Sequence, residues 1–514
     1  MDSKDKLIEE LQKQVAELKS VVEHQNELIA QLRHQLFGSP SEKSRRVNPT
    51  DKPANGENKP PVNSNKKDSN GSKKKPRGGG RGKLSAQLMR VRHLLDYIKT
   101  CKRCGIDCKI ISQHSVEKLS VLPLMFYVVE YVNTHTACPC CDDQIYTAKA
   151  EPSFVPNSQA TPELLAHTAI GKCSDGLPLY RQFKQTQRVD CPIHRSKLDR
   201  WLINAGMGLK PFVEVIRDRF NQYRAGGIDE TRLQVIKEEG KTAYQLSRLF
   251  VRYGGPPNQR VMLVDYKPKK DQKTVDDILE PFEGGGIVCD MYSAFISHTK
   301  KRNLLLFACT DHCRRKFVEA LELIPKKSRS GTVSQRIIEL YKKVYHVETL
   351  AKGRSFRVIK RLRKRSRKIL NQIYAIIEGI QARPESKLGK AVFYAIQHKK
   401  ALFNYLDYPW APHTNIMAEH IAKKIAIVRK NMLFCYSASG AESLANIMTV
   451  IYTAELYTGH NLFDYMTVLF LELPKAENTD DLERLLPWNI SPQKVAEIIS
   501  QRPRPKVVSN DLAA

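Results

Sequence analysis

The chain has 514 residues, more than one compact core usually spans, so several folded units are expected. Lys and Arg total 84 against 54 acidic residues, and the net charge of +30 favours a nucleic-acid partner over a merely soluble basic protein. No apolar run could span a bilayer and no signal peptide begins the chain, which excludes a membrane protein and predicts a cytoplasmic one with reduced cysteines.

Residues 1–37 carry apolar side chains at every third or fourth position, from Ile8 to Leu36. One polar residue, Gln25, interrupts this seam. Such a heptad pattern predicts a coiled coil that joins copies of the chain into a homo-oligomer. The alternative is a lone amphipathic helix packed on its own domain, and the polar linker that follows favours self-association.

Residues 38–90 are dominated by Pro, Gly, Asn, Ser and Lys and show no periodicity. Between Lys43 and Lys83, thirteen Lys or Arg stand against three acidic residues. This composition cannot bury enough apolar surface to fold, so it predicts a disordered basic linker. The linker would track phosphates without sequence preference, or act only as a solubilising tether.

A small module over residues 91–150 is bounded by two C-x2-C pairs, and its four paired cysteines are Cys101, Cys104, Cys138 and Cys141. Four thiolates at this spacing predict a tetrahedral structural Zn²⁺ site that stabilises a small domain. A redox C-x-x-C motif needs only one pair within a βαβ unit, so the presence of two pairs argues against it.

Residues 151–220 contain three short helical patterns, which are punctuated by Gly176 and Pro192. They carry basic residues that suit a helix-turn-helix-like reader of DNA. A helical hairpin that packs on the following domain is almost as well supported. The basic residues are Arg181, Lys184, Arg195, Lys197 and Arg200.

From Gly227 the pattern changes to that of strands, and an α/β domain is expected over residues 221–470, followed by a C-terminal element over 471–514. Three consecutive strands, a helical crossover and two further strands give the order of an RNase H-like fold. Asp229 is expected to open the first strand and Asp290 to end the fourth. Two divalent cations held between such carboxylates would promote phosphoryl transfer, and Mg²⁺ prefers oxygen ligands of this kind.

A third carboxylate is expected from a later helix. Long helical patterns occupy residues 312–406, and nine of the fifteen residues from Arg354 to Lys368 are Lys or Arg. Glu419 follows in a helical stretch, four positions after Asn415 and on the same face. Alone, an acidic residue on a helix is usually solvated, so its role depends on the pairing with the two aspartates.

Several motifs in the same order resemble the large transposase of the insertion-sequence-66 family, and the resemblance covers nearly the whole chain. These are LFGSPSEKS after the coiled-coil segment, the two cysteine pairs, TPELLAHTAIGKCSDGLPLYRQ from Thr161, IDET around Asp229, CDMYSAF around Asp290, HCRRKF from His312, and NIMAEHIAKKIAIVRKNMLF around Glu419. The chain departs from the family pattern at Met291, where Gly is usual, at Ile416, where Asn is common, and at the residues that flank His312.

The resemblance implies a DDE transposase in which Asp229, Asp290 and Glu419 use two Mg²⁺ or Mn²⁺ ions to cut the ends of a bacterial insertion element and join them to target DNA. It also implies that the helices before Glu419 are inserted into an RNase H-like core, and that accessory proteins of the same element could take part. The expected partner is double-stranded DNA, and the expected location of the protein is the cytoplasm, in association with the nucleoid. Further DNA contacts are expected from His312, Arg314, Arg315, Arg429 and Lys430.

Two other functions fit the same residues. A nuclease or resolvase would hydrolyse DNA with these carboxylates but would not join strands. A catalytically inactive zinc-containing DNA-binding protein would carry the acids only as solvated surface.

Overall fold

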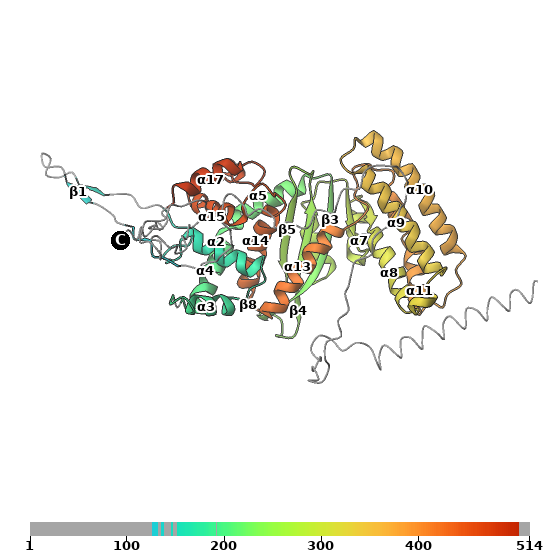
Figure 1. The fold of residues 1–514 in the computed structure, drawn as a ribbon, viewed down its shortest axis with the longest axis horizontal. Coiled ribbons are helices and arrows are strands. Elements are labelled where there is room, and N and C mark those ends of the chain that lie inside the picture. Colours follow the sequence, from blue (N-terminus) through green and yellow to red (C-terminus); the bar gives the residue numbers. More distant parts are fainter. Residues whose placement is uncertain (1–125, 132–134, 138–144, 148–151, 192, 503–514) are drawn as a thin grey trace, which may run out of the picture. The chain divides into compact units, whose positions relative to one another are not determined.

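The structure is a computed structural model, which describes residues 126–131, 135–137, 145–147, 152–191 and 193–502, all within one compact unit. The predicted coiled coil, the basic linker and the four paired cysteines lie outside the described residues. The described part is a mixed α/β core with many helices, as the sequence predicted (Figure 1).

The first described elements are a short antiparallel hairpin and a group of four helices. The hairpin pairs β1 (His135–Ala137) with β2 (Ile145–Thr147). The helices are α2 (Pro162–Cys173), α3 (Leu179–Gln187), α4 (Arg195–Gly208) and α5 (Lys210–Asn221). Helix α2 begins after Thr161, because the Thr161 hydroxyl accepts a hydrogen bond from the N–H of Leu164 and proline occupies the first turn.

A mixed sheet follows, with the strand order β5-β4-β3-β6-β7. Strands β3 (Ala225–Lys237), β4 (Leu246–Gly254) and β5 (Val261–Lys267) are antiparallel neighbours. After α6 (Gln272–Leu279), β6 (Gly286–Cys289) pairs parallel to β3, and after α7 (Ser293–Lys301), β7 (Leu305–Ala308) pairs parallel to β6. All five strands that the sequence predicted are therefore present in the predicted order.

Helices from the C-terminal part of the chain complete the main hydrophobic core. Helix α13 (Ile416–Met432) packs against β3, and β8 (Cys435–Ser437) pairs with the far end of the same strand. Helix α14 (Ala438–Ala454) packs on β5, where Thr449 and Thr453 accept hydrogen bonds from backbone N–H groups of that strand. These hydroxyls provide hydrogen-bond acceptors for N–H groups of the edge strand β5 that have no neighbouring strand on that side. Helices α15 (Leu462–Glu472), α16 (Thr479–Arg484) and α17 (Pro492–Ser500) follow, with the short 3-10 helix η3 (Leu473–Lys475) after α15.

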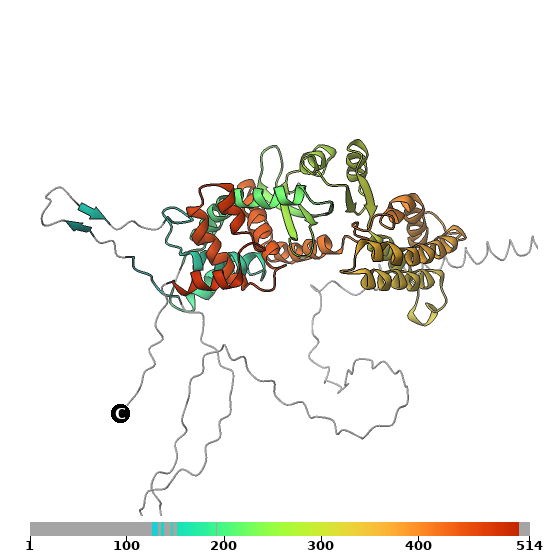
Figure 2. The same cartoon turned by 90° about the horizontal axis from the view of Figure 1, so that it is seen from above.

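A second hydrophobic core lies among the helices between β7 and α13, which form one group in yellow to brown in Figure 2. They are α8 (Thr310–Glu322), α9 (Val333–Ala351), α10 (Phe356–Glu378), α11 (Lys387–Gln397) and α12 (Lys399–Asn404), with the short 3-10 helix η2 (Lys326–Ser328) between α8 and α9. Buried Arg363 of α10 pairs with Glu348 of α9 at 3.0 Å and donates to the carbonyl of Ala411 at 2.9 Å. Helix α10 is therefore anchored to the segment that leads into α13.

Candidate active site

The register of the parallel strands brings the two aspartates to the same level. Gly227 of β3 pairs with Val288 of β6, and the same offset continued by two residues sets Asp290 opposite Asp229. Asp290 directly follows β6, as predicted, but Asp229 lies four residues inside β3 instead of opening it, because pairing with β4 and β6 already begins near Ala225. By the register between β6 and β7, Cys309 lies level with Asp290.

Backbone N–H groups orient both aspartate side chains. Oδ1 of Asp229 accepts from the N–H of Glu230 at 2.8 Å, and Oδ1 of Asp290 accepts from the N–H of Tyr292 at 3.0 Å. The second bond requires a tight turn, and Met291 makes it with a φ of 71°. Neither aspartate forms an ion pair with a Lys, Arg or His of the described residues.

Burial and the neighbouring acidic residues change the pKa of Asp229. The pKa of the Asp229 carboxyl is raised to about 6, first by burial and then by the negative charges of Asp290 and Glu419, against the opposing effects of the Glu230 N–H and of His312. Three acidic residues that are far apart in the chain therefore interact at one edge of the sheet.

Helix α13 brings Glu419 to this edge, and Asn415 fixes the start of that helix. The side-chain amide of Asn415 donates to the carbonyl of Ile228 at 2.7 Å, next to Asp229 in β3. A Cβ at Gly227 would lie 2.4 Å from Oδ1 of Asn415, so only glycine leaves room for this contact. One turn later, Glu419 is 4% exposed.

The carboxylate of Glu419 is surrounded by groups of α8. Arg315 donates to Oε2, His312 Nδ1 lies 3.3 Å from Oε1, and the Cys309 thiol lies 3.7 Å from the same oxygen. Burial alone would raise the pKa of Glu419, but the hydrogen bonds and charges of His312 and Arg315 outweigh burial and lower it to about 2. The pKa of His312 rises to about 10: burial opposes the rise, and the contacts with Cys309 and Glu419 cause it.

Two further residues near the acidic cluster have partners of their own. Glu230, which follows Asp229 in the IDET motif, pairs with Lys270 at 2.6 Å and is thereby neutralised. Arg429, predicted to contact DNA, instead donates to the carbonyl of Arg232 at 2.5 Å and so holds the end of α13 against β3. Cys309 was not singled out from the sequence, and its only sequence signal is its position at the end of a predicted strand.

A model of the IS66 transposase family matches residues 157–443, which is more than half of the chain and includes all three acidic residues. The chain belongs to the IS66 family of transposases.

Relatives of this IS66 transposase in Sinorhizobium fredii (strain NBRC 101917 / NGR234) extend the similarity beyond that range. The chain is 25% identical to uncharacterized protein y4jD over 415 residues, which cover 78% of the chain and 80% of the relative. It is 26% identical to uncharacterized protein y4qI over 439 residues, which cover 82% of the chain and 78% of that relative. Family membership supports a transposase role and DNA as the partner.

The basic residues of the IS66 transposase that were predicted to contact DNA fall into two groups. Those on α3 and α4 are all exposed: Arg181, Lys184, Arg195, Lys197 and Arg200. Lys430 of α13 is exposed as well, whereas Arg314 is half-buried and its guanidinium lies 5.9 Å from the ring centre of Tyr345. In the second group, His312 and Arg315 contact Glu419, Arg429 contacts β3 and Arg314 lies beside Tyr345. Lys430 forms no hydrogen bond or ion pair with the described residues.

A further basic surface lies on α10, within the run that was noted in the sequence. Seven exposed cations form no ion pair with acidic residues of the described chain: Arg354, Arg357, Lys360, Arg361, Lys364, Arg365 and Lys368. Arg354 precedes the helix, and at 100° per residue the other six lie within about 140° of the helix circumference, opposite the buried stripe that includes Leu370 and Ile377. We call these seven residues the α10 basic face.

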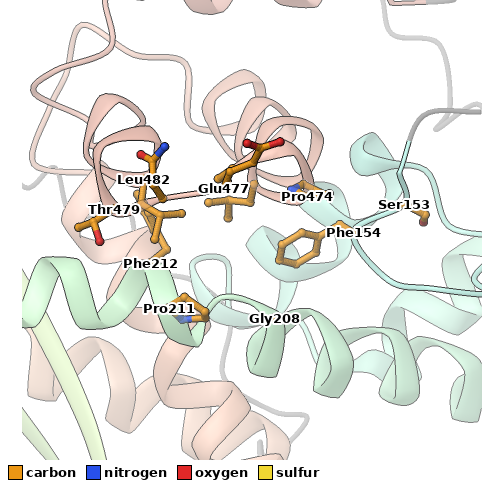
Figure 3. A pocket seen from close by; sticks show the side chains of 12 residues that line it. Ser153, Phe154, Gly208, Pro211, Phe212, Pro474, Glu477, Thr479 and Leu482 are labelled. Carbon is orange, nitrogen blue, oxygen red and sulfur yellow. The ribbon is translucent and has the colours of Figure 1, made fainter.

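One cavity among the described residues lies away from the three carboxylates. It has a volume of about 540 Å³ and lies between the start of α5 and the segment from Leu473 to Leu482. Figure 3 shows Phe154, Phe212 and Leu482 around it, with Glu477 at its side. No helix in the described part of the chain is long and apolar enough to cross a membrane.

Proposed function

We propose that this chain is a DDE transposase that cleaves the ends of a bacterial insertion sequence and joins the 3′-hydroxyls to target DNA. One observation carries the proposal: Asp229, Asp290 and Glu419 come from three separate elements and interact electrostatically at one sheet edge. The strand order β5-β4-β3-β6-β7, with β4 antiparallel to both of its neighbours β3 and β5, supports an RNase H-like core. In this reading the helices α8 to α12 are the helical insertion of that core.

The donor set fits divalent cations such as Mg²⁺ or Mn²⁺. Asp229 and Asp290 offer hard oxygen ligands without an ion-pair partner among the described residues. The pKa of Asp229 is raised first by its burial and then by the negative charges of Asp290 and Glu419. Two ions bound there would activate the attacking hydroxyl group and stabilise the leaving oxygen in phosphoryl transfer. Glu419 belongs to the same charge cluster and would join the ligand set when its contacts with Arg315 and His312 open.

The chain's own groups prepare the site for this reaction. The N–H groups of Glu230 and Tyr292 hold each aspartate by one oxygen, which leaves the other oxygen for a ligand. The Tyr394 hydroxyl of α11 donates to the carbonyl of Asp290 at 3.3 Å and connects the site to the inserted helices. Arg315 is 44% exposed and, once released from Glu419, can neutralise charge on the scissile phosphate.

The remaining parts of the chain would hold DNA and join subunits. We propose that the exposed cations of α3 and α4 and the α10 basic face bind the phosphates of double-stranded DNA. The four paired cysteines would bind structural Zn²⁺, and the coiled coil over residues 1–37 would join two subunits, so that two element ends are held together. Accessory proteins of the element and nucleoid association fit the same role.

Strand cleavage and joining on DNA that carries the element's ends, with Mg²⁺, tests the proposal. Asp229→Asn, Asp290→Asn and Glu419→Gln should each abolish both steps. Glu442→Gln is the matched control, because Glu442 is exposed and pairs with Lys210 away from the site, and this variant should keep both activities.

The other outcomes select the alternatives. Cleavage without joined products would replace the transposase by a nuclease or resolvase. DNA binding by the native chain with no metal-dependent cleavage, and with no effect of the three substitutions, would replace it by a DNA-binding protein.

A further inference from the structure

Three residues with different ligand atoms meet beside the acidic cluster. Cys309 caps the start of α8, His312 lies in the first turn of that helix, and Glu419 lies in the first turn of α13. Their ligand atoms all lie within 4.8 Å of one another. Cys309 is fully buried and Glu419 is 4% exposed, so two of the three donors are held away from water.

The two separations from Oε1 of Glu419 agree with those around a single zinc ion. Zinc bonds of about 2.3 Å to sulfur and about 2.0–2.1 Å to nitrogen and oxygen, at tetrahedral angles, put sulfur about 3.5 Å from oxygen and nitrogen about 3.3 Å from oxygen. The observed distances to Oε1 of Glu419 are 3.7 Å from Cys309 Sγ and 3.3 Å from His312 Nδ1. Zinc would thus need little movement of these side chains, whereas Mg²⁺ disfavours sulfur and nitrogen ligands.

Neighbouring groups support the cluster as a ligand set. The backbone N–H of Asn415 donates to Cys309 Sγ at 3.2 Å, which stabilises a thiolate. Arg315 binds Oε2 of Glu419 and leaves Oε1 facing Cys309 and His312. The His312 side chain is 26% exposed, so an ion can reach the cluster from solvent on that side.

We propose that Cys309, His312 and Glu419 form a zinc-binding site, separate from the paired cysteines, and that zinc bound there inhibits the enzyme. Three protein ligands leave a fourth tetrahedral position for water. The inhibition follows from geometry, because a Glu419 carboxylate that is bonded to zinc is held towards α8 and is withheld from Asp229 and Asp290. Zinc binding stands without the proposed function, whereas the inhibition rests on it.

Zinc binding is measured first, on the full chain, as the stoichiometry and affinity for Zn²⁺ in competition with a chromophoric chelator. Cys309→Ala and His312→Asn should each lose one equivalent of zinc relative to the native chain, or bind it at least 100-fold more weakly. Cys313→Ala is the matched control, because Cys313 is equally buried on α8 but contacts the Tyr341 hydroxyl instead of the cluster. Full stoichiometry and affinity in both Cys309→Ala and His312→Asn would overturn the site.

Co²⁺ substitution separates this site from the paired cysteines. The intensity of the thiolate-to-cobalt absorption should fall in Cys309→Ala by the share of one thiolate, and should be unchanged in Cys313→Ala. An equal loss in both variants would indicate general destabilisation and overturn the assignment.

Inhibition is measured as the zinc concentration that halves Mg²⁺-dependent strand cleavage, each variant compared with its own zinc-free rate. The native chain and Cys313→Ala should be inhibited alike, and Cys309→Ala should need at least tenfold more zinc. Equal zinc sensitivity of all three would overturn the inhibitory role. If the native chain cleaves no DNA, the proposed function fails, while the binding measurements still decide the zinc site.

Discussion

Asp229→Asn should stabilise the protein in the absence of divalent cations. The native state raises the pKa of this carboxyl from its ordinary value of 3.8 to about 6, so folding disfavours the ionised form. One pKa unit corresponds to about 1.4 kcal/mol, so the ionised carboxylate lowers the free energy of unfolding by about 3 kcal/mol at pH 7.5. Asparagine removes the charge and can still accept the N–H of Glu230.

The pH dependence gives the sign of this effect. Because the folded chain binds the Asp229 proton more tightly than the unfolded chain, stability falls as pH rises from about 3.8 to about 6, and the deficit is complete above that range. At pH 5 the gain from Asp229→Asn should therefore be only about half of its value at pH 7.5.

Urea unfolding of the native chain, Asp229→Asn and the control Glu442→Gln at both pH values, without added divalent cations, measures these differences. Added Mg²⁺ should stabilise the native chain and leave Asp229→Asn almost unchanged, because the substitution removes a ligand. A variant as stable as the native chain at pH 7.5, or a gain that does not shrink at pH 5, would refute the argument that buried like charges strain this site.

Three other substitutions test other parts of the structure. Asp265→Asn leaves two arginines without their buried partner and should lower the free energy of unfolding by about 3–5 kcal/mol in urea. Gly227→Ala puts a Cβ against Asn415, so it should cost about 1–3 kcal/mol and abolish strand cleavage through displacement of α13. Replacing Arg361 and Lys364 of the α10 basic face by Ala should weaken binding to any duplex and reduce the slope of log K against log salt concentration by about 0.9 per lost phosphate contact.

Each of these substitutions has a control, which makes the same kind of change at a position that lacks the tested contact. Asp480→Asn removes an exposed carboxylate that forms no ion pair with the described residues, and should be neutral. Gly379→Ala adds a Cβ with no neighbour closer than 3.6 Å, so a comparable loss of cleavage there would remove the steric argument. Lys494→Ala with Lys475→Ala removes two exposed cations that already pair with acidic residues. If this control changes the salt slope as much as the replacement of Arg361 and Lys364 does, the α10 basic face does not bind DNA phosphates specifically.

The sequence alone determined the elements of the core and their order. The apolar patterns predicted β3 to β7, the helices α2, α3, α4, α6 and α13, and a helical stretch over residues 312–406, because these patterns follow from which face of each element is buried. They did not predict α5 or α7. The expected strand order puts Asp229 and Asp290 on neighbouring strands, whereas Glu419 was chosen because it completes the set with these aspartates and its segment resembles a family motif.

Only the tertiary structure decided what surrounds these acids. Whether Glu419 contacts Arg315 and His312, or faces open solvent, depends on how α8 and α13 pack, which no local pattern specifies. In the same packing, Cys309 contacts Glu419, which lies 110 residues later in the sequence, and Arg429 donates to a backbone carbonyl of β3. Strand register and helix packing are long-range properties, so the sequence could name the reactive residues but not their partners.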